Sequence, residues 1–361
     1  MKFKGVSYDV GIVYWENWRP DFDPKVVHRE LEIIKNDLHC NAVGICGRDL
    51  DRLMTATEDA LEQGLYVLLS PRLWDKSQED TLTYLINIAK GAEMLRKRWP
   101  EKLVFSIGSE LTLFMQGIVK GRNVTERLNN LMLKFKQEKL FQPDKDDILE
   151  HVHAGEFNKL LNTFLVKANS AVRNVFHGKV TYASLIWESV DWNLFDIIGV
   201  DHYRNDRIKE KYVDMLKPLF SYGKPVNITE FGYRTFQGAT SNATGIEGDI
   251  IDLRSLFLHY IFGRLVKPRL KGIYLRDEAL QARELVDQLS VLEKVGVEGA
   301  YISTFVTPLA YFDENPMYDL DMASYSLVKS YRGKKHGQTY HDLKWEPKES
   351  FHAVADYYLK H

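Results

Sequence analysis

Eight short apolar segments, rich in β-branched and aromatic residues, alternate with helical patterns along this 361-residue chain. They are nearly continuous hydrophobic runs, which is typical of parallel strands covered on both faces. The predicted strands are 3–8, 41–46, 65–70, 103–108, 179–186, 195–200, 225–230 and 299–305. Eight strand–helix units predict an α/β fold of the (β/α)8 type, the TIM barrel. A doubly wound sheet is the alternative, but it would not need eight units.

The segments between the strands have helical periodicity. In 24–39, apolar residues at Val27, Leu31, Ile34 and Leu38 form one stripe. Further helices are predicted at 50–63, 77–97, 155–176, 207–221, 278–295 and 348–360.

Three connections are long: 111–154, 231–277 and 306–347 follow strands four, seven and eight. All three leave the C-terminal ends of strands, the face where barrel enzymes build their sites. The middle of the first, VKGRNVTERLNN, is polar and basic and predicts a solvated lid. Since no linker or repeat interrupts the pattern, we expect one barrel domain over residues 1–361.

Composition limits the function classes. The chain is 45% hydrophobic and 27% charged, as in a soluble globular protein, and its net charge of −2 gives no attraction to nucleic acid or an anionic membrane. The N-terminal segment lacks a signal-peptide pattern and no run approaches a membrane span, so we expect a cytoplasmic protein. Cys40 and Cys46 flank a predicted strand and are expected to be free thiols. No sequence feature assigns an oligomeric state.

Two glutamates follow wholly apolar predicted strands. Glu110 comes just past strand four (LVFSIGSELT), and Glu230 ends strand seven (PVNITEFGY). A carboxylate in that position is costly to bury without a partner or a task. Two of them across a barrel mouth suit glycosidic bond cleavage, which needs a proton donor and an anion. The alternative is that each glutamate only pairs with a neighbouring arginine.

Carboxylates after strands four and seven resemble the signature of the clan A glycoside hydrolases. The resemblance implies that Glu110 is the general acid/base and Glu230 the nucleophile of a retaining double displacement on a β-linked sugar. Most clan members have Asn immediately before the acid/base, where this chain has Ser109. The clan also ends strand eight in a tryptophan under the sugar, and the nearest residue here is Phe305.

Other residues at strand ends fit supporting roles. By resemblance, Arg48 after strand two would hold Glu230 ionised, and Tyr203 after strand six would donate a hydrogen bond to it. Alternation places Asp201 and Tyr203 on one face of the strand and His202 on the other. Asp201 could bind a sugar hydroxyl or pair with an arginine. The alternative for this group is an ordinary buried polar network.

Aromatic residues at strand ends are candidates for stacking on a sugar face. Arg72 and Trp74 follow strand three, and Trp187 follows strand five. A lone tryptophan is nevertheless more often part of a core than of a site.

Other chemistries have weaker signals. The histidines are scattered, and His151-x-His153 lies in a predicted loop without matching carboxylates, so we expect no metal. Gly232, Gly238, Gly245 and Gly248 are spread too widely for a phosphate-binding loop, and no dinucleotide fingerprint occurs, so no cofactor is expected.

A second resemblance rests on the segment NDLHCNAVGICG, residues 36–47, and on FDPKVVHRELEIIKNDL, which overlaps its start. It is similar to bacterial barrel proteins often labelled abortive infection protein, which implies phage exclusion. From the resemblance to glycoside hydrolases, the expected partner is a carbohydrate substrate. The alternative is a non-catalytic barrel with a binding or phage-defence role.

Overall fold

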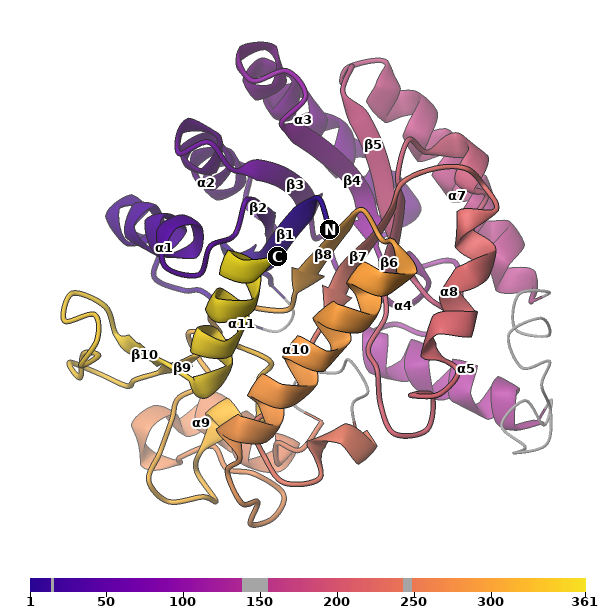
Figure 1. The fold of residues 1–361 in the computed structure, drawn as a ribbon. Coiled ribbons are helices and arrows are strands. Elements are labelled where there is room, and N and C mark those ends of the chain that lie inside the picture. Colours follow the sequence, from indigo (N-terminus) through magenta and orange to yellow (C-terminus); the bar gives the residue numbers. More distant parts are fainter. Residues whose placement is uncertain (14–15, 138–154, 243–248) are drawn as a thin grey trace.

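The computed structural model describes residues 1–13, 16–137, 155–242 and 249–361. Eight parallel strands pair in sequence order, and β8 closes the sheet against β1 (Figure 1). Their bounds are β1 Phe3–Asp9, β2 Ala42–Gly47, β3 Tyr66–Pro71, β4 Leu103–Ser109, β5 Lys179–Leu185, β6 Ile198–Asp201, β7 Val226–Phe231 and β8 Gly299–Ile302. The closed sheet with helices around it confirms the predicted α/β class and the (β/α)8 barrel.

Helices surround the barrel (Figure 1). Their bounds are α1 Pro24–Asn36, α2 Leu50–Glu62, α3 Gln78–Arg98, α4 Leu111–Phe114, α5 Val124–Gln137, α7 Glu156–Arg173, α8 Tyr212–Phe220, α9 Leu253–Phe262, α10 Glu278–Val295 and α11 Glu349–Lys360. Most ends of the predicted helices agree with the observed ends within a few residues. Several helices begin directly after a residue whose side chain caps the first turn, such as Asp23, Asp49 and Ser77. The fifth helix of the predicted set, 207–221, begins later, at Tyr212.

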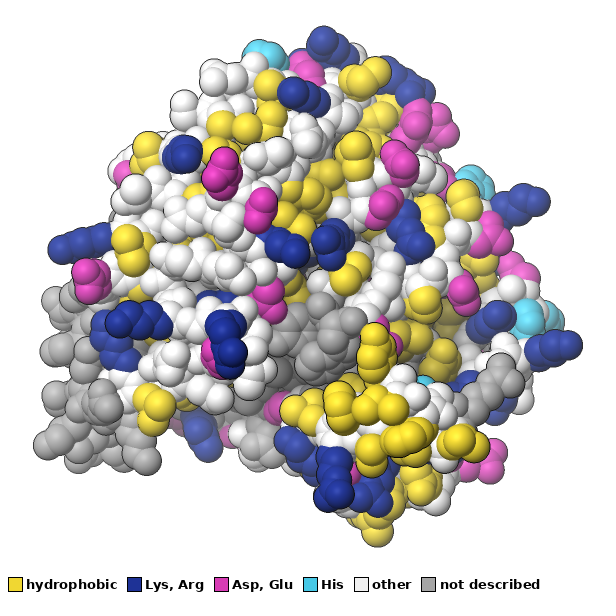
Figure 2. Space-filling view, turned by 180° about the vertical axis from the view of Figure 1, so that it is seen from behind, with side chains coloured by type: hydrophobic (Ala, Val, Ile, Leu, Met, Phe, Trp, Pro, Cys, Tyr) yellow, Lys and Arg dark blue, Asp and Glu magenta, His cyan; other side chains and the backbone are white. Residues whose placement is uncertain are grey.

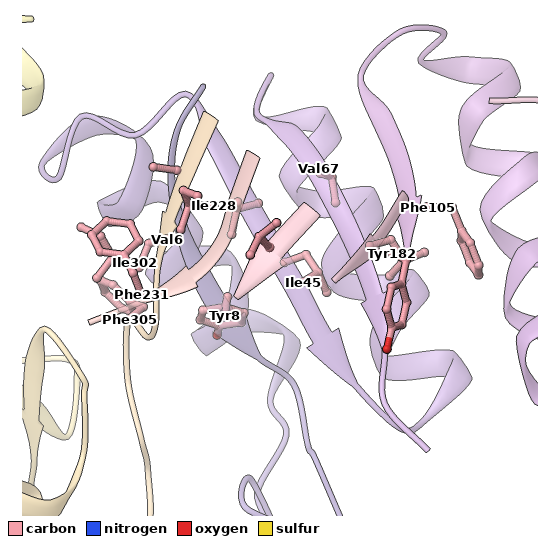
Figure 3. Close-up of a cluster of buried hydrophobic side chains, with 14 of the residues drawn as sticks. Val6, Tyr8, Ile45, Val67, Phe105, Tyr182, Ile228, Phe231, Ile302 and Phe305 are labelled. Atoms are coloured by element: carbon pink, nitrogen blue, oxygen red, sulfur yellow. The ribbon is translucent and has the colours of Figure 1, made fainter. Parts of the chain in front are cut away.

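Alternate strand residues build two layers. One set faces the helices and forms the main core; Figure 3 shows Val6, Ile45 and Val67 from successive strands among it. The other set lies inside the barrel, where Ala42, Leu68 and Tyr301 form a separate cluster. The ring of Tyr301 fills the space beside Gly5, since a Cβ on that glycine would lie 2.4 Å from the ring.

Part of the first long connection, predicted to be a solvated lid, is helical. Residues 124–137 form α5, and Arg127 on this helix is fully buried. Its guanidinium donates to the carbonyls of Leu113 and Gly121 and forms an ion pair with Asp75. Arg127 is therefore an anchor, whereas the other two basic residues of the polar stretch, Lys120 and Arg122, are exposed. The part of the predicted lid at 138–154 lies outside the described residues.

A buried ion-pair network holds the connections after β7 and β8 together. Arg276 pairs with Glu278, Asp319 and Asp321 at 2.7 to 2.8 Å, and fully buried Lys348 pairs with Asp321 at 2.8 Å. These residues come from the end of one connection, the start of α10, the middle of the other connection and the cap of α11. Buried charges are tolerated here because each has partners of opposite sign.

Cys40 and Cys46 are both buried thiols that form no disulfide, as expected. Among the residues with described positions, no helix is both long enough and apolar enough to span a bilayer.

Glu278 makes the buried network dependent on pH. Burial alone would raise its pKa, but the positive charges of Arg276 and Lys329 outweigh burial and lower the pKa to about 2. A depressed folded-state pKa contributes stability above the ordinary pKa of Glu, and this contribution is lost as the pH falls toward the folded value. We expect Glu278→Gln to lower the free energy of unfolding at pH 7 by about 3 kcal/mol. Urea unfolding should show most of that difference gone at pH 3, and an equal difference at both pH values would contradict the assignment.

Candidate active site

Glu110 is positioned by an irregularity at the end of β4. The register between β4 and β5 shifts between Ser106 and Ser109, and Gly108 there has a φ of 132°. Glu110 follows in the left-handed region, with φ 49° and ψ 41°. A non-glycine residue adopts that conformation only when its surroundings enforce it, and such residues cluster at functional sites. The turn sends the chain into α4.

The end of β5 holds this turn in place. The backbone N–H of Leu111 donates to Tyr182 Oη at 2.8 Å, and that of Thr112 donates to Glu188 Oε1 at 3.2 Å. Tyr182 Oη in turn donates to Glu188 Oε2 at 2.9 Å. Burial raises the pKa of Glu188 to about 7. Glu188 thus caps the first turn after Glu110.

Glu230 is held by two donors, one just past the end of β3 and one just past the end of β6. Arg72 forms an ion pair with its Oε1 through Nη2, and Tyr203 donates to its Oε2 at 3.1 Å. The register between β6 and β7 shifts just before Asp201 pairs with Glu230. Such bulges re-aim side chains beside active sites. The contact from Tyr203 is the one the resemblance implied.

A second set of hydrogen bonds joins Arg72 to Asp201. Arg72 Nη1 donates to Ser109 Oγ at 2.6 Å, and Ser109 Oγ donates to Asp201 Oδ2 at 3.1 Å. Thr229 Oγ1 donates to the other oxygen of Asp201 at 2.6 Å. Ser109, which replaces the clan asparagine, therefore uses its single proton inside the protein.

Three carboxylates converge at the barrel mouth. One oxygen each from Glu110, Asp201 and Glu230 lies within 4.8 Å of the others. Burial, followed by the negative charges of Asp201 and Glu230, raises the pKa of Glu110 well above its ordinary value, and Arg72 offsets only part of this. Within the described residues, the Glu110 carboxyl has no hydrogen-bond or ion-pair partner, whereas Glu230 has two.

The two glutamates therefore occupy opposite electrostatic environments. The environment of Glu110 favours the protonated acid, whereas Glu230 receives a positive charge from Arg72 and a hydrogen bond from Tyr203. Carboxyl groups in such different environments are suited to acid and nucleophile roles. Oxygen ligands so close together could also attract a hard divalent cation. Arg72 already supplies positive charge between them, and the expectation of no metal stays a prediction.

The structure corrects the assignment of the arginine. Arg72 on the strand-three side contacts Glu230, where the resemblance had pointed to Arg48. The backbone carbonyl of Arg48 accepts a hydrogen bond from the hydroxyl of Tyr84 on α3. Burial raises the pKa of Tyr84, and the positive charge of Arg48 offsets part of this. Arg48 thus interacts with a surrounding helix. Both arginines directly follow strands, so the sequence signal was equal, and only the direction of the side chain separates them.

Phe305 does not lie under the mouth. Strand β8 ends at Ile302, and Phe305 is fully buried beside Trp345 and Phe351. Figure 3 places it near Ile302 and Phe231 in the outer core layer. Its backbone N–H donates to the carbonyl of Ser7, which directs the chain outward over β1. A sugar cannot stack on this ring.

The two tryptophans are half-buried and packed on other rings. Trp74 stacks on Phe114 at 4.1 Å, and Trp187 meets Phe157 edge-on at 5.9 Å.

The prediction that His202 lies on the opposite face of strand six from Asp201 and Tyr203 is correct. His202 points away from Glu230 and stacks on Tyr212 at 4.1 Å, where burial lowers its pKa to about 3.

The sequence reasoning gave Ser303 and Glu188 no role in the site. Burial raises the pKa of Tyr203 well above its ordinary value, and a hydrogen bond with the side chain of Ser303 offsets part of this increase. Ser303 directly follows β8 and is half-buried. Its place at a strand end was the available signal, but serine is too common in turns to draw notice.

No protein-family model matches this sequence, and no curated protein matches it. Solved structures share the fold. A GH113 β-1,4-mannanase in complex superposes with a TM-score of 0.60 at 14% identity, covering 100% of both chains. The GH113 β-mannanase AaManA from Alicyclobacillus acidocaldarius, in complex with ManMIm, gives 0.57 at 12% identity over 100% of this chain and 98% of that one. This chain therefore shares its (β/α)8 barrel fold with these mannanases.

A β-glucuronidase from Ruminococcus gnavus also shares the fold, with a TM-score of 0.54 at 12% identity. The match covers 99% of this chain but only 50% of that protein, so the shared part is the barrel. At these identities the likeness shows the fold alone. The comparisons give no support to the resemblance to abortive infection proteins.

The carboxylate cluster predicts a coupling that can be measured directly. Since burial and then the charge of Asp201 raise the pKa of Glu110, we expect Asp201→Asn to lower that pKa. Carbon-13 NMR titration of protein labelled at glutamate carboxyls would follow it. Asp214→Asn, on exposed α8, is the matched control and should leave the titration unchanged. An unchanged or higher pKa in Asp201→Asn would refute the coupling.

Proposed function

We propose that this protein is a retaining glycoside hydrolase acting on a β-linked sugar, with Glu110 as acid/base and Glu230 as nucleophile. The observation that carries the proposal is the pair of close carboxyl groups in opposite electrostatic environments. Retaining enzymes place the two carboxyl groups about 5 to 5.5 Å apart, and inverting enzymes about 6.5 to 9.5 Å. Oxygens within 4.8 Å fit the retaining class.

The first step displaces the leaving group. Glu230 Oε attacks the anomeric carbon as the glycosidic C–O bond breaks, and the proton of Glu110 passes to the departing oxygen. The raised pKa favours the protonated form of Glu110 that this step needs. Arg72 and Tyr203 hold the Glu230 carboxyl group and orient it for attack.

The second step releases the sugar. Glu110, now ionised, takes a proton from water, and the water oxygen attacks the anomeric carbon as its bond to Glu230 breaks. Tyr203 and Arg72 then stabilise the carboxylate that leaves. Ser109 and Asp201 keep Arg72 in place through the second arm of its guanidinium.

Azide rescue should separate the two glutamate roles on activated aryl β-glycosides. We expect Glu110→Ala and Glu230→Ala each to lose about 10²-fold or more in kcat, since each removes a group that reacts. Azide fits the space of a missing carboxylate. It should restore turnover in both variants, giving the β-glycosyl azide with Glu110→Ala and the α-glycosyl azide with Glu230→Ala.

Glu62→Ala, on the exposed surface of α2, is the control and should keep wild-type kcat. Negligible turnover by the wild-type protein on all such glycosides would overturn the proposal and favour a non-catalytic binding barrel. Azide products of one configuration from both variants would overturn the role assignment.

The charge of the site favours a neutral sugar. Within the described mouth, Glu110, Asp201 and Glu230 outnumber Arg72, and both arms of that guanidinium are already engaged. A glucuronide would bring a fourth carboxylate next to this cluster, which like-charge repulsion disfavours. We therefore favour the kind of substrate named for the mannanase neighbours over that named for the glucuronidase.

Paired substrates test this preference. At pH 7, we expect kcat/KM for 4-nitrophenyl β-mannoside to exceed that for the β-glucuronide by about 10²-fold, equivalent to one close charge repulsion. The ratio should fall at low pH, as the glucuronide becomes neutral. A glucuronide preference would contradict the neutral-sugar assignment and leave the glutamate roles intact.

A further inference from the structure

The connection after β7 carries an apolar surface that faces solvent. On α9, Leu253, Phe257, Tyr260 and Ile261 are exposed. Their spacing of i, i+4, i+7 and i+8 places them on one side of the helix. An amphipathic helix of a globular protein normally turns that stripe toward the core. Here it points outward, and only Ser255 of the helix is buried.

The residues after the helix extend this surface. Phe262, Leu265 in the 3-10 turn η3 Gly263–Leu265, Ile273 and Leu275 are also exposed. Residues 253–275 thus hold eight of the sixteen large exposed hydrophobic side chains in the described chain. Half of them on one short segment is a concentration that soluble monomers rarely show without a binding role. We call these eight side chains the α9 surface.

Figure 2 shows this concentration as a raised yellow area at the lower right, with Lys and Arg side chains beside it. The surface borders the C-terminal face of the barrel, because it follows β7, whose end carries Glu230. His259 of α9 acts electrostatically on Glu16, which follows β1 at the same face.

The charge of this segment is one-sided. Residues 253–275 contain five Lys or Arg and no Asp or Glu, in a chain whose net charge is −2. Lys267 and Arg269 have carboxylate partners, Asp313 and Asp252. Arg254 and Lys271 are exposed and have no ion pair with any described residue. The net charge of the chain, which predicted no attraction to an anionic membrane, hides this local excess.

We propose that the α9 surface docks on an anionic lipid membrane. An outward apolar stripe with flanking basic residues is the pattern of helices that lie in the membrane interface. Lys and Arg there attract anionic headgroups, and aromatic side chains such as Tyr260 and Phe257 enter the headgroup region. A second copy of the chain would bring two basic segments together, which like charges disfavour. The inference does not depend on the proposed hydrolase activity.

Vesicle flotation tests the docking. With the full chain, we expect binding to vesicles of phosphatidylcholine containing phosphatidylglycerol, weak binding to pure phosphatidylcholine, and release at high salt. The double variant Phe257→Ser/Leu265→Ser should lose about tenfold or more in partition coefficient, because it removes side chains that are 62% and 88% exposed. Met94→Ser/Leu359→Ser is the matched control, with side chains 71% and 67% exposed on other helices.

A charge variant keeps the test independent of folding defects. Arg254→Glu/Lys271→Glu leaves every apolar side chain in place and should reduce binding to the anionic vesicles alone. No wild-type binding, equal binding to both vesicle types, or equal loss in Met94→Ser/Leu359→Ser would overturn the proposal. A dimer in sedimentation that only Phe257→Ser/Leu265→Ser dissociates, without vesicle binding, would assign the surface to a second copy.

Discussion

Closure of the sheet between β8 and β1 is the constraint on which the rest of the structure depends. Because all eight strands run parallel, closure brings all their C-terminal ends to one mouth. Residues from β3, β4, β6 and β7 then meet within hydrogen-bonding distance although they are up to 158 positions apart, as Arg72 and Glu230 are. An open sheet would leave these ends in a row and could not place one guanidinium against both Ser109 and Glu230.

Charge within the mouth is the second organising interaction. Three carboxylates close together repel one another, and burial adds to the cost of ionising each. Arg72 relieves part of that cost at Glu230 and reaches Asp201 through Ser109. Glu110 receives no such partner among the described residues, and its pKa is raised well above the ordinary value of a glutamate. One positive charge is therefore distributed unequally between two chemically similar side chains.

Irregular backbone positions the two glutamates, Glu110 and Glu230, at the barrel mouth. Register shifts occur in β4 just before Glu110 and in β7 around Glu230, and Glu110 itself has a left-handed conformation. The cost of such backbone is of order 1 kcal/mol or more per residue, and the hydrogen bonds that Tyr182 and Glu188 accept from the next turn offset it. The α9 surface shows another local departure, since an apolar stripe turned outward is costly in water unless a partner covers it.

The sequence by itself determined the barrel, because the spacing of apolar runs and helical stripes is local information that each segment carries alone. It also determined where Glu110, Glu230 and Tyr203 would gather, since parallel strand ends meet in any closed barrel. Only the tertiary structure decided that Arg72 rather than Arg48 contacts Glu230, that Phe305 turns into the core, and that Arg127 is an anchor. In each of these cases a turn or bulge sets the direction of a side chain. That direction depends on hydrogen bonds to distant strands, which no local pattern contains.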